Sequence, residues 1–284
     1  MLFILIAALF SVAVSVLLKI YKNKQYDIFQ ILSFNYLTAS VLAFVWFKPS
    51  MSVLTWSSPW WLIIIMAVLL PLVFWFLHQS LRYAGLIKTE IAQRISVILT
   101  ILVSAIIYQE HFSLLKIVGI TLGLIAVFCI LYGKATEKEL SKNRKYMWLS
   151  VIGVWLGYAV IDLLFKYLST QGMQFSVSLN LIFIFAALLT LLWNFAKKTV
   201  WTKSSVLAGS VLGILNFSNI AFYLYAHQQL KDSPAVVFAS MNILVVVLGI
   251  IAAIVIFKEK INVSKVLGGS FAVAAVYCLM QSMM

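Results

Sequence analysis

The stretch YQEHFSLLKIVGI, residues 108–120, has a counterpart in FKEKINVSKVLGG, residues 257–269. In each stretch a glutamate is followed by a lysine and then by a glycine. The matching pairs are Glu110 with Glu259, Lys116 with Lys265, and Gly119 with Gly268. Charged residues that recur in register within apolar sequence favour an internal duplication over chance. The chain is therefore expected to contain two copies of one structural unit.

The composition indicates a membrane protein. Of the 284 residues, 64% are hydrophobic and only 10% are charged, with a mean hydropathy of +1.06. A soluble domain carries about 25% charged residues, so this chain has too few polar side chains to cover a water-facing surface. The net charge of +13 comes from residues scattered over short loops. This scatter excludes a basic nucleic-acid-binding face and makes the lipid bilayer the expected partner.

Apolar segments long enough to cross a bilayer, about 20 residues each, predict ten helices. The expected spans are Leu2–Leu18, Ile28–Phe47, Trp60–Gln79, Ile91–Tyr108, Leu114–Tyr132, Met147–Tyr167, Val177–Phe195, Val206–Ala226, Ala235–Phe257 and Val266–Met283. The one long polar stretch, GKATEKELSKNRK at residues 133–145, lies near the middle. We therefore expect an all-α integral membrane protein with five helices in residues 1–133, a basic linker at 134–145 and five more helices in 146–284.

The two halves are expected to cross the membrane in opposite directions. The duplication extends to HQSLR at 78–82 and HQQLK at 227–231, and to Lys19 and Lys166 at the ends of the first and sixth spans. Because five is an odd number, the second copy must enter from the other face, which gives an inverted repeat. No cleavable leader is evident before the first span, which is expected to be retained.

The distribution of basic residues predicts the orientation. The loops after odd-numbered spans hold about sixteen Lys and Arg residues, and the other loops hold four, namely Lys48, Lys116, Lys166 and Lys231. Basic loops stay in the cytoplasm, so both termini are predicted to lie outside a cell (inner) membrane.

This pattern resembles the drug/metabolite transporter superfamily, and within it the EamA-like ten-helix exporters. The features that carry the resemblance are the two five-helix halves, the glutamate before each final helix with K-x-x-G after it, and the lysine that ends each first helix. The resemblance implies transport without ATP of amino acids, other small metabolites, nucleotide sugars or organic phosphates. LIKTEIAQR at residues 86–94 is more charged than the family pattern.

Two charged residues of that fourth span are candidate substrate-binding residues. Glu90 and Arg94 are four residues apart on one helix face. A charge near the bilayer centre costs about 2.5–3.5 kcal/mol, so such residues usually face protein or a water-filled cavity. Arg94 could bind a carboxylate or phosphate of the substrate. The alternative is an internal ion pair between Glu90 and Arg94.

Five further residues are candidates for coupling or gating. Asp162 and Lys166 share a helix face in the sixth span, and Lys166 matches Lys19. Lysines at helix ends could close a gate with a carboxylate or simply extend to the interface. His78 and His227 also match each other and could relay protons or cap backbone groups near span ends.

Uncharged polar residues complete the predicted substrate site. Asn216, Asn219 and Tyr223 form one stripe on the eighth span, while Gln93 and Asn242 occupy matching positions in spans four and nine. Amides in membrane helices can bind a polar substrate or tie helices together. We expect the set to line a cavity at the midplane.

The sequence therefore predicts a secondary transporter that exports small polar metabolites such as amino acids by alternating access. Organic phosphates or nucleotide sugars are the alternative substrates, and a passive channel or a lipid-modifying membrane enzyme the less favoured alternatives. No GxxxxGK[ST] motif and no clustered catalytic or metal-binding residues occur. No enzyme activity, metal or cofactor is thus expected. Cys129 and Cys278 are interpreted as buried thiols, and the protein as a monomer or homodimer.

Overall fold

A computed structural model describes residues 2–21, 26–56, 58–108, 113–132, 144–230, 234–259 and 262–282. These residues form ten α-helices and one short 3-10 turn, η1, and contain no β-strand. The elements are α1 (Leu2–Tyr21), α2 (Ile28–Phe47), η1 (Met51–Val53), α3 (Trp60–Tyr83), α4 (Leu86–Tyr108), α5 (Leu114–Tyr132), α6 (Arg144–Thr170), α7 (Phe175–Ala196), α8 (Lys203–Gln229), α9 (Pro234–Val255) and α10 (Val263–Gln281).

The ten predicted helices are confirmed in position, with one difference in length that bears on function. The sequence places the start of the fourth span at Ile91, whereas α4 begins at Leu86. Gly85 makes the turn with a positive φ of 85°, a conformation that glycine adopts at little cost. The Leu86 amide then donates to a Glu259 carboxylate oxygen at 2.6 Å. A carboxylate distant in sequence thus caps the helix, which hydropathy cannot reveal.

The helices have the character of a multi-pass membrane protein. Six of them, α1, α2, α3, α6, α7 and α8, contain segments long and apolar enough to cross a membrane. Shorter apolar segments lie in α5, α9 and α10, while α4 carries three charged residues in its first half. Many large apolar side chains point outward, including Trp46, Trp61 and Leu192. Such surfaces are expected where lipid is the solvent.

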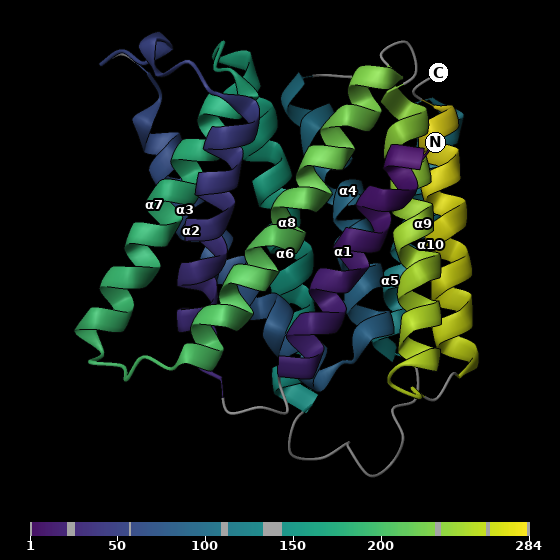
Figure 1. Cartoon of the computed structure of the whole chain (residues 1–284). Helices are drawn as coiled ribbons and strands as arrows, with labels where there is room; N and C mark the ends of the chain where they lie inside the picture. The colour runs from purple at the N-terminus through teal and green to yellow at the C-terminus, as the bar shows by residue number, and fades with distance from the viewer. Residues whose placement is uncertain are drawn as a thin grey trace.

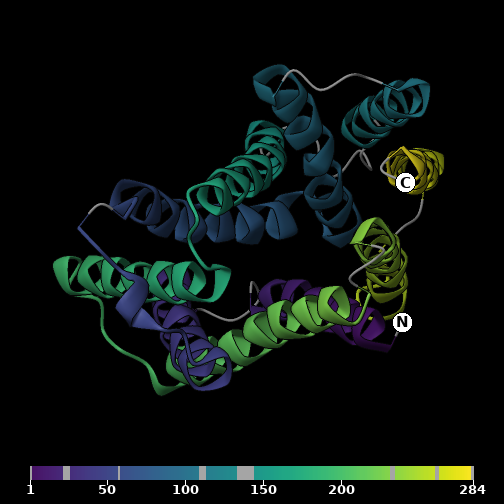
Figure 2. The same cartoon turned by 90° about the horizontal axis from the view of Figure 1, so that it is seen from above.

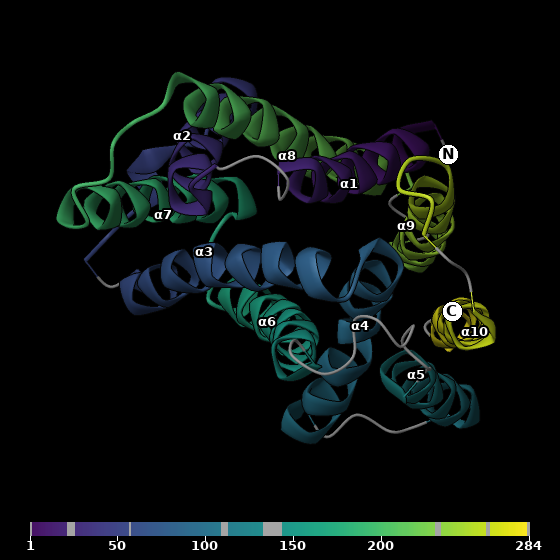
Figure 3. The same cartoon turned by 90° about the horizontal axis from the view of Figure 1, so that it is seen from below.

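The helices run side by side between two ends of the bundle (Figure 1). α1 begins and α10 ends at one end, called here the terminal end. α1 and α7 end, and α6 and α8 begin, at the opposite end, called here the linker end. Seen along the bundle, α2 and α7 lie at one side and α5 and α10 at the other (Figures 2 and 3).

The most extensive helix packing joins the first five helices to the last five. α5 packs on α10, α2 packs on α7 and α8, α6 packs on α3 and α4, and α1 packs on α8 and α9. Close approach of α2 and α8 depends on two glycines of α8. A Cβ at Gly209 would lie 2.5 Å from the Ile31 carbonyl oxygen, and one at Gly213 would lie 2.6 Å from that of Asn35. Small residues spaced four apart are a common means of such packing in membranes.

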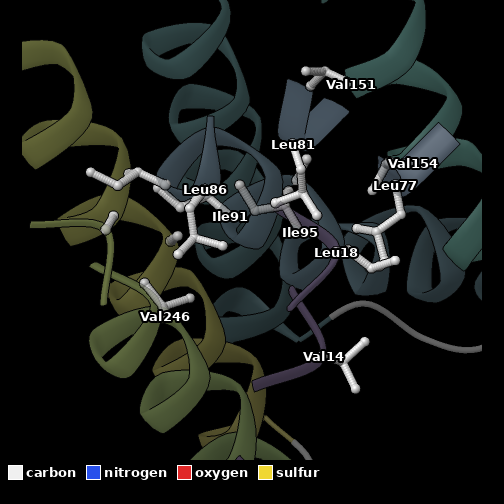
Figure 4. Close-up of a cluster of buried hydrophobic side chains, with 14 of the residues drawn as sticks. Val14, Leu18, Leu77, Leu81, Leu86, Ile91, Ile95, Val151, Val154 and Val246 are labelled. Atoms are coloured by element: carbon white, nitrogen blue, oxygen red, sulfur yellow. The ribbon is translucent and has the colours of Figure 1, made fainter. Parts of the chain in front are cut away.

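A cluster of buried aliphatic side chains includes residues of α1, α3, α4, α6 and α9 (Figure 4). Val14 and Leu18 come from α1, and Leu77 and Leu81 from α3, each pair one turn apart. Leu86 of α4 completes this layer and is fully buried. The layer lies between the centre of the bundle and the linker end.

Candidate functional site

A cavity of about 200 Å³ lies in the middle of the bundle. Its polar lining comes from α1, α4, α6 and α8, and most of its apolar lining from α3, α6 and α7. The polar side chains are Ser11, Ser15, Gln93, Arg94, Tyr158, Asn216 and Asn219. Phe74, Phe165 and Phe183 contribute aromatic surface. The cavity therefore has a polar region beside an apolar one.

Arg94 is the cation that lines this cavity. Its Nη2 donates a hydrogen bond to the Ser11 hydroxyl of α1 at 2.8 Å. Its Nε is buried and makes no hydrogen bond within the described residues. A buried guanidinium has five donors and is costly to leave unsatisfied. Arg94 thus makes one side-chain hydrogen bond, and its Nε has no acceptor in the described part of the chain.

Glu90, one turn earlier on α4, is only 1% exposed. Both of its carboxylate oxygens are buried, and neither makes a hydrogen bond in the described part of the chain. Its electrostatic neighbours are Arg94 and Ser15 of α1. On the other side it packs against α9, where a Cβ at Gly249 would lie 2.9 Å from the Glu90 Cγ. Glu90 is close enough to influence Arg94 but does not itself line the cavity.

The alternative to substrate binding, an ion pair between Glu90 and Arg94, is not formed; the ion pair within 4 Å in the described part of the chain joins Lys19 and Glu259. The four-residue spacing puts Glu90 and Arg94 on one face, as predicted. Ser11 of the neighbouring helix instead receives the guanidinium hydrogen bond.

Four of the seven predicted substrate-binding residues line the cavity: Gln93, Arg94, Asn216 and Asn219. The Gln93 Nε2 and the Asn219 Oδ1 are buried without hydrogen bonds in the described residues. Asn242 is buried on α9 outside this lining. Tyr223 also lies outside it but interacts electrostatically with Arg94 and Asp162.

Asp162 of α6 belongs to the electrostatic surroundings of the cavity. It interacts with Arg94 and with the Tyr158 hydroxyl. Tyr158, Ile161 and Phe165 on the same helix face line the cavity. Asp162 itself is not among the lining residues, so it acts on Arg94 electrostatically from a different helix.

The other predicted coupling or gating residues lie away from the cavity. Lys19 forms an ion pair with Glu259 near the linker end. Lys166, its repeat counterpart, is exposed near the end of α6. His227 meets the Tyr223 ring edge to face at 4.6 Å, and His78 is partly buried on α3. The cavity lining includes neither histidine.

Sequence reasoning missed the two serines of α1 and the aromatic part of the lining. Ser11 and Ser15 are one turn apart and face Arg94 and Glu90, which are also one turn apart. The sequence could not show that these two pairs face each other, because only the fold brings α1 against α4. Phe74, Phe165 and Phe183 resemble many other phenylalanines in the apolar spans, so no sequence signal distinguished them.

A larger groove of about 580 Å³ lies between α4, α9 and α10. Its lining is almost entirely aliphatic, with Ser270 and Tyr277 as the polar exceptions. A polar metabolite would find no charged group there. The smaller central cavity is therefore the better candidate site.

Comparison with protein families identifies the class. Residues 1–132, which include the first five helices, match the model of the EamA-like transporter family. The chain belongs to this family. As a member of the EamA-like transporters, which form part of the drug/metabolite transporter superfamily, it falls in a class of membrane transporters and not of enzymes.

Two further similarities cover the whole of this EamA-like transporter. An uncharacterized protein of Haemophilus influenzae is 40% identical, over 97% of this chain and 96% of that protein. A solved crystal structure aligns with a TM-score of 0.58 and 15% identity, over 96% of each chain. At that identity the alignment supports the fold alone. It shows that the arrangement of both halves recurs in an experimentally determined protein.

Proposed function

We propose that this EamA-like transporter is a secondary transporter that exports small, carboxylate-bearing polar metabolites such as amino acids. The observation that carries the proposal is the central cavity, where Arg94 keeps a buried Nε without a hydrogen-bond partner in the described residues. Arginine is suited to binding a carboxylate, because its charge strengthens the hydrogen bonds that it donates.

The size and charge of the cavity favour a small carboxylate over the alternative substrates. Pockets for drug-sized ligands are about 300–1,000 Å³, and this cavity is about 200 Å³. A nucleotide sugar would exceed that space. An organic phosphate carries close to two negative charges, whereas Arg94 is the one cation in the lining. A single carboxylate matches a single guanidinium.

Asp162 extends this proposal to a zwitterion. It interacts electrostatically with Arg94 from a different helix. A ligand with an ammonium and a carboxylate could place its ammonium toward Asp162 and its carboxylate toward Arg94. The aromatic side chains Phe74, Phe165 and Phe183 would then contact its apolar part.

We also propose that all ten helices cross the membrane as two inverted five-helix repeats. The packing supports this, since an exchange of each helix with the one five positions away maps α3·α6 onto α1·α8, and α4·α6 onto α1·α9. The same exchange maps α2·α8 onto α3·α7. Repeats of this kind can exchange conformations and so alternate access to one central site. In the proposed orientation the basic loops and the linker end lie in the cytoplasm, and both termini lie on the outer side of the cell (inner) membrane.

Counterflow in proteoliposomes tests the function. The purified protein would first be screened by thermal shift against amino acids, other monocarboxylates and phosphorylated metabolites. A carrier is expected to take up labelled ligand faster when unlabelled ligand is present on the opposite side. Uptake independent of trans ligand would indicate a passive channel. Stabilisation by phosphorylated compounds alone would contradict the proposed substrate class.

A further inference from the structure

We propose that Glu259 is a latch that closes the central cavity at the linker end and fixes the start of α4. The inference rests on the proposed transport function, because a cavity needs a closure only if it must open to alternate faces. It extends that function by naming the group that holds one face shut.

Glu259 joins three separate parts of the chain. It lies between α9 and α10, and its carboxylate forms an ion pair with Lys19 near the end of α1. The same oxygen accepts a hydrogen bond from the Leu86 amide at the start of α4 at 2.6 Å. Lys19 also lies over the Phe257 ring, 4.2 Å from its centroid. One carboxylate thus connects α1, α4 and the α9–α10 turn.

The surroundings of Glu259 are shaped for it. A Cβ at Gly85 would lie 2.9 Å from a Glu259 carboxylate oxygen, so any other residue there would displace the carboxylate. Lys19 and Glu259 are about 13% and 12% exposed. Hydrogen bonds to charged groups are stronger than neutral ones, and partial burial reduces the screening of this pair by salt. Removal of one charge would therefore leave the other poorly compensated.

The latch lies directly beyond the layer that closes the cavity. Val14 of α1 and Leu77 of α3 line the cavity. One turn closer to the linker end on the same helices are Leu18 and Leu81, both buried. Lys19 follows Leu18. From the centre outward, α1 thus contributes first to the cavity, then to an apolar seal and finally to the ion pair.

The cavity extends away from the latch. Phe165 lies in the last two turns of α6, and Leu179 lies about one turn after the start of α7. The connection between these two helices is at the terminal end (Figure 1). The lining therefore reaches toward the terminal end, while the seal and Glu259 occupy the linker end. This structure corresponds to a state closed at the linker end.

For the cavity to reach the linker end, α1 must separate from α4 and from the α9–α10 turn. That movement breaks the contact of Glu259 with Lys19, with Leu86, or with both. Because Glu259 caps α4, the same movement also releases the helix that carries Glu90, Gln93 and Arg94. Opening at the linker end is thereby linked to a change in the binding site.

Cysteine accessibility tests this latch without any substrate. Ile220 lines the cavity, and Ile220→Cys would be introduced after Cys129 and Cys278 are replaced by serine. A membrane-impermeant methanethiosulfonate reagent is applied separately to each face of oriented vesicles. With Glu259 intact, the cysteine should react slowly from the linker-end face. Glu259→Gln and Lys19→Met should each increase that rate about tenfold, which corresponds to 1.4 kcal/mol.

Three comparisons make the test specific. Glu259→Gln keeps an acceptor for the Leu86 amide, so Glu259→Ala should raise the rate further. The Lys19→Met/Glu259→Gln double variant should react little faster than either single variant, because the two substitutions remove the same interaction. Lys203→Gln removes an exposed positive charge at the same end, at the start of α8, and should leave the rate unchanged. Size-exclusion profiles establish that each variant is folded.

Equal reactivity from both faces in the parent protein, or an unchanged rate in either Glu259→Gln or Lys19→Met, would overturn the latch. The proposed transport function is judged separately by counterflow. A protein with the expected labelling pattern but without ligand-stimulated exchange would retain the latch and lose the transport proposal. Normal exchange, together with variants that label no faster than the parent, would retain the transport proposal and rule out the latch.

Discussion

The Arg94 guanidinium donates a hydrogen bond to the Ser11 hydroxyl, 2.8 Å away on a different helix. This contact joins α4 to α1 at the edge of the central cavity. It leaves the Nε of Arg94 buried and without a hydrogen bond among the described residues. The polar part of the cavity lining thus includes one cation whose hydrogen-bonding capacity is incompletely satisfied.

Replacement of this cation should weaken anion binding. Arg94→Gln keeps a similar length but removes the charge, and should weaken carboxylate binding about tenfold or more, since hydrogen bonds to charged groups contribute about 1.5–3 kcal/mol. Thermal-shift titration with the carboxylates found in the initial screen measures the effect. Arg82→Gln, an exposed arginine near the end of α3, is the matched control. Equal affinity in the Arg94 variant and the parent would refute the assigned role.

Glu90→Gln should have the opposite effect on affinity. The Glu90 carboxylate interacts with Arg94 from one turn away and so competes with an anionic ligand for its charge. Loss of that competition should tighten carboxylate binding about fivefold, or about 1 kcal/mol. The same titration measures it, with Glu90→Asp as the charge-preserving comparison. Weaker binding in Glu90→Gln would mean that Glu90 supports the ligand instead.

The close packing of α8 on α2 predicts a stability effect. Gly209→Leu would force side-chain atoms against the Ile31 carbonyl, where a Cβ alone would be 2.5 Å away. Overpacking of this kind costs about 1–3 kcal/mol. Val211→Leu, at a position on the same helix that is 37% exposed, adds bulk toward lipid and should be neutral. Melting temperatures in detergent compare the two, and equal values would contradict the packing argument.

The orientation of the chain is testable with terminal tags. In the proposed orientation, with the basic loops in the cytoplasm, both tags should be protease-accessible from outside intact cells. A cysteine introduced at Lys203, exposed at the start of α8, should react with an impermeant reagent only in inverted vesicles. Detection of the two tags on opposite faces would rule out the proposed ten-span topology.

The sequence predicted the helices well because long apolar segments determine membrane helices almost by themselves. The start of α4 could not be found this way, since it depends on Glu259 after the ninth helix. The candidate site was predicted in part. Arg94, Gln93, Asn216 and Asn219 stand out as polar residues in apolar spans. Ser11 and Ser15 do not, because serine is tolerated in membrane helices and only the fold places them opposite α4.

The two sets of five helices depend on each other for packing, since α5 packs on α10, α2 on α7 and α8, and α6 on α3 and α4. Neither set of five helices is a self-contained module, since each covers its apolar faces mainly with helices of the other set. The stability of the protein should therefore depend more on the association of the two sets than on an intact chain between residues 132 and 144. Two separately expressed fragments, cut between α5 and α6, would have to find each other in the bilayer to be stable at all.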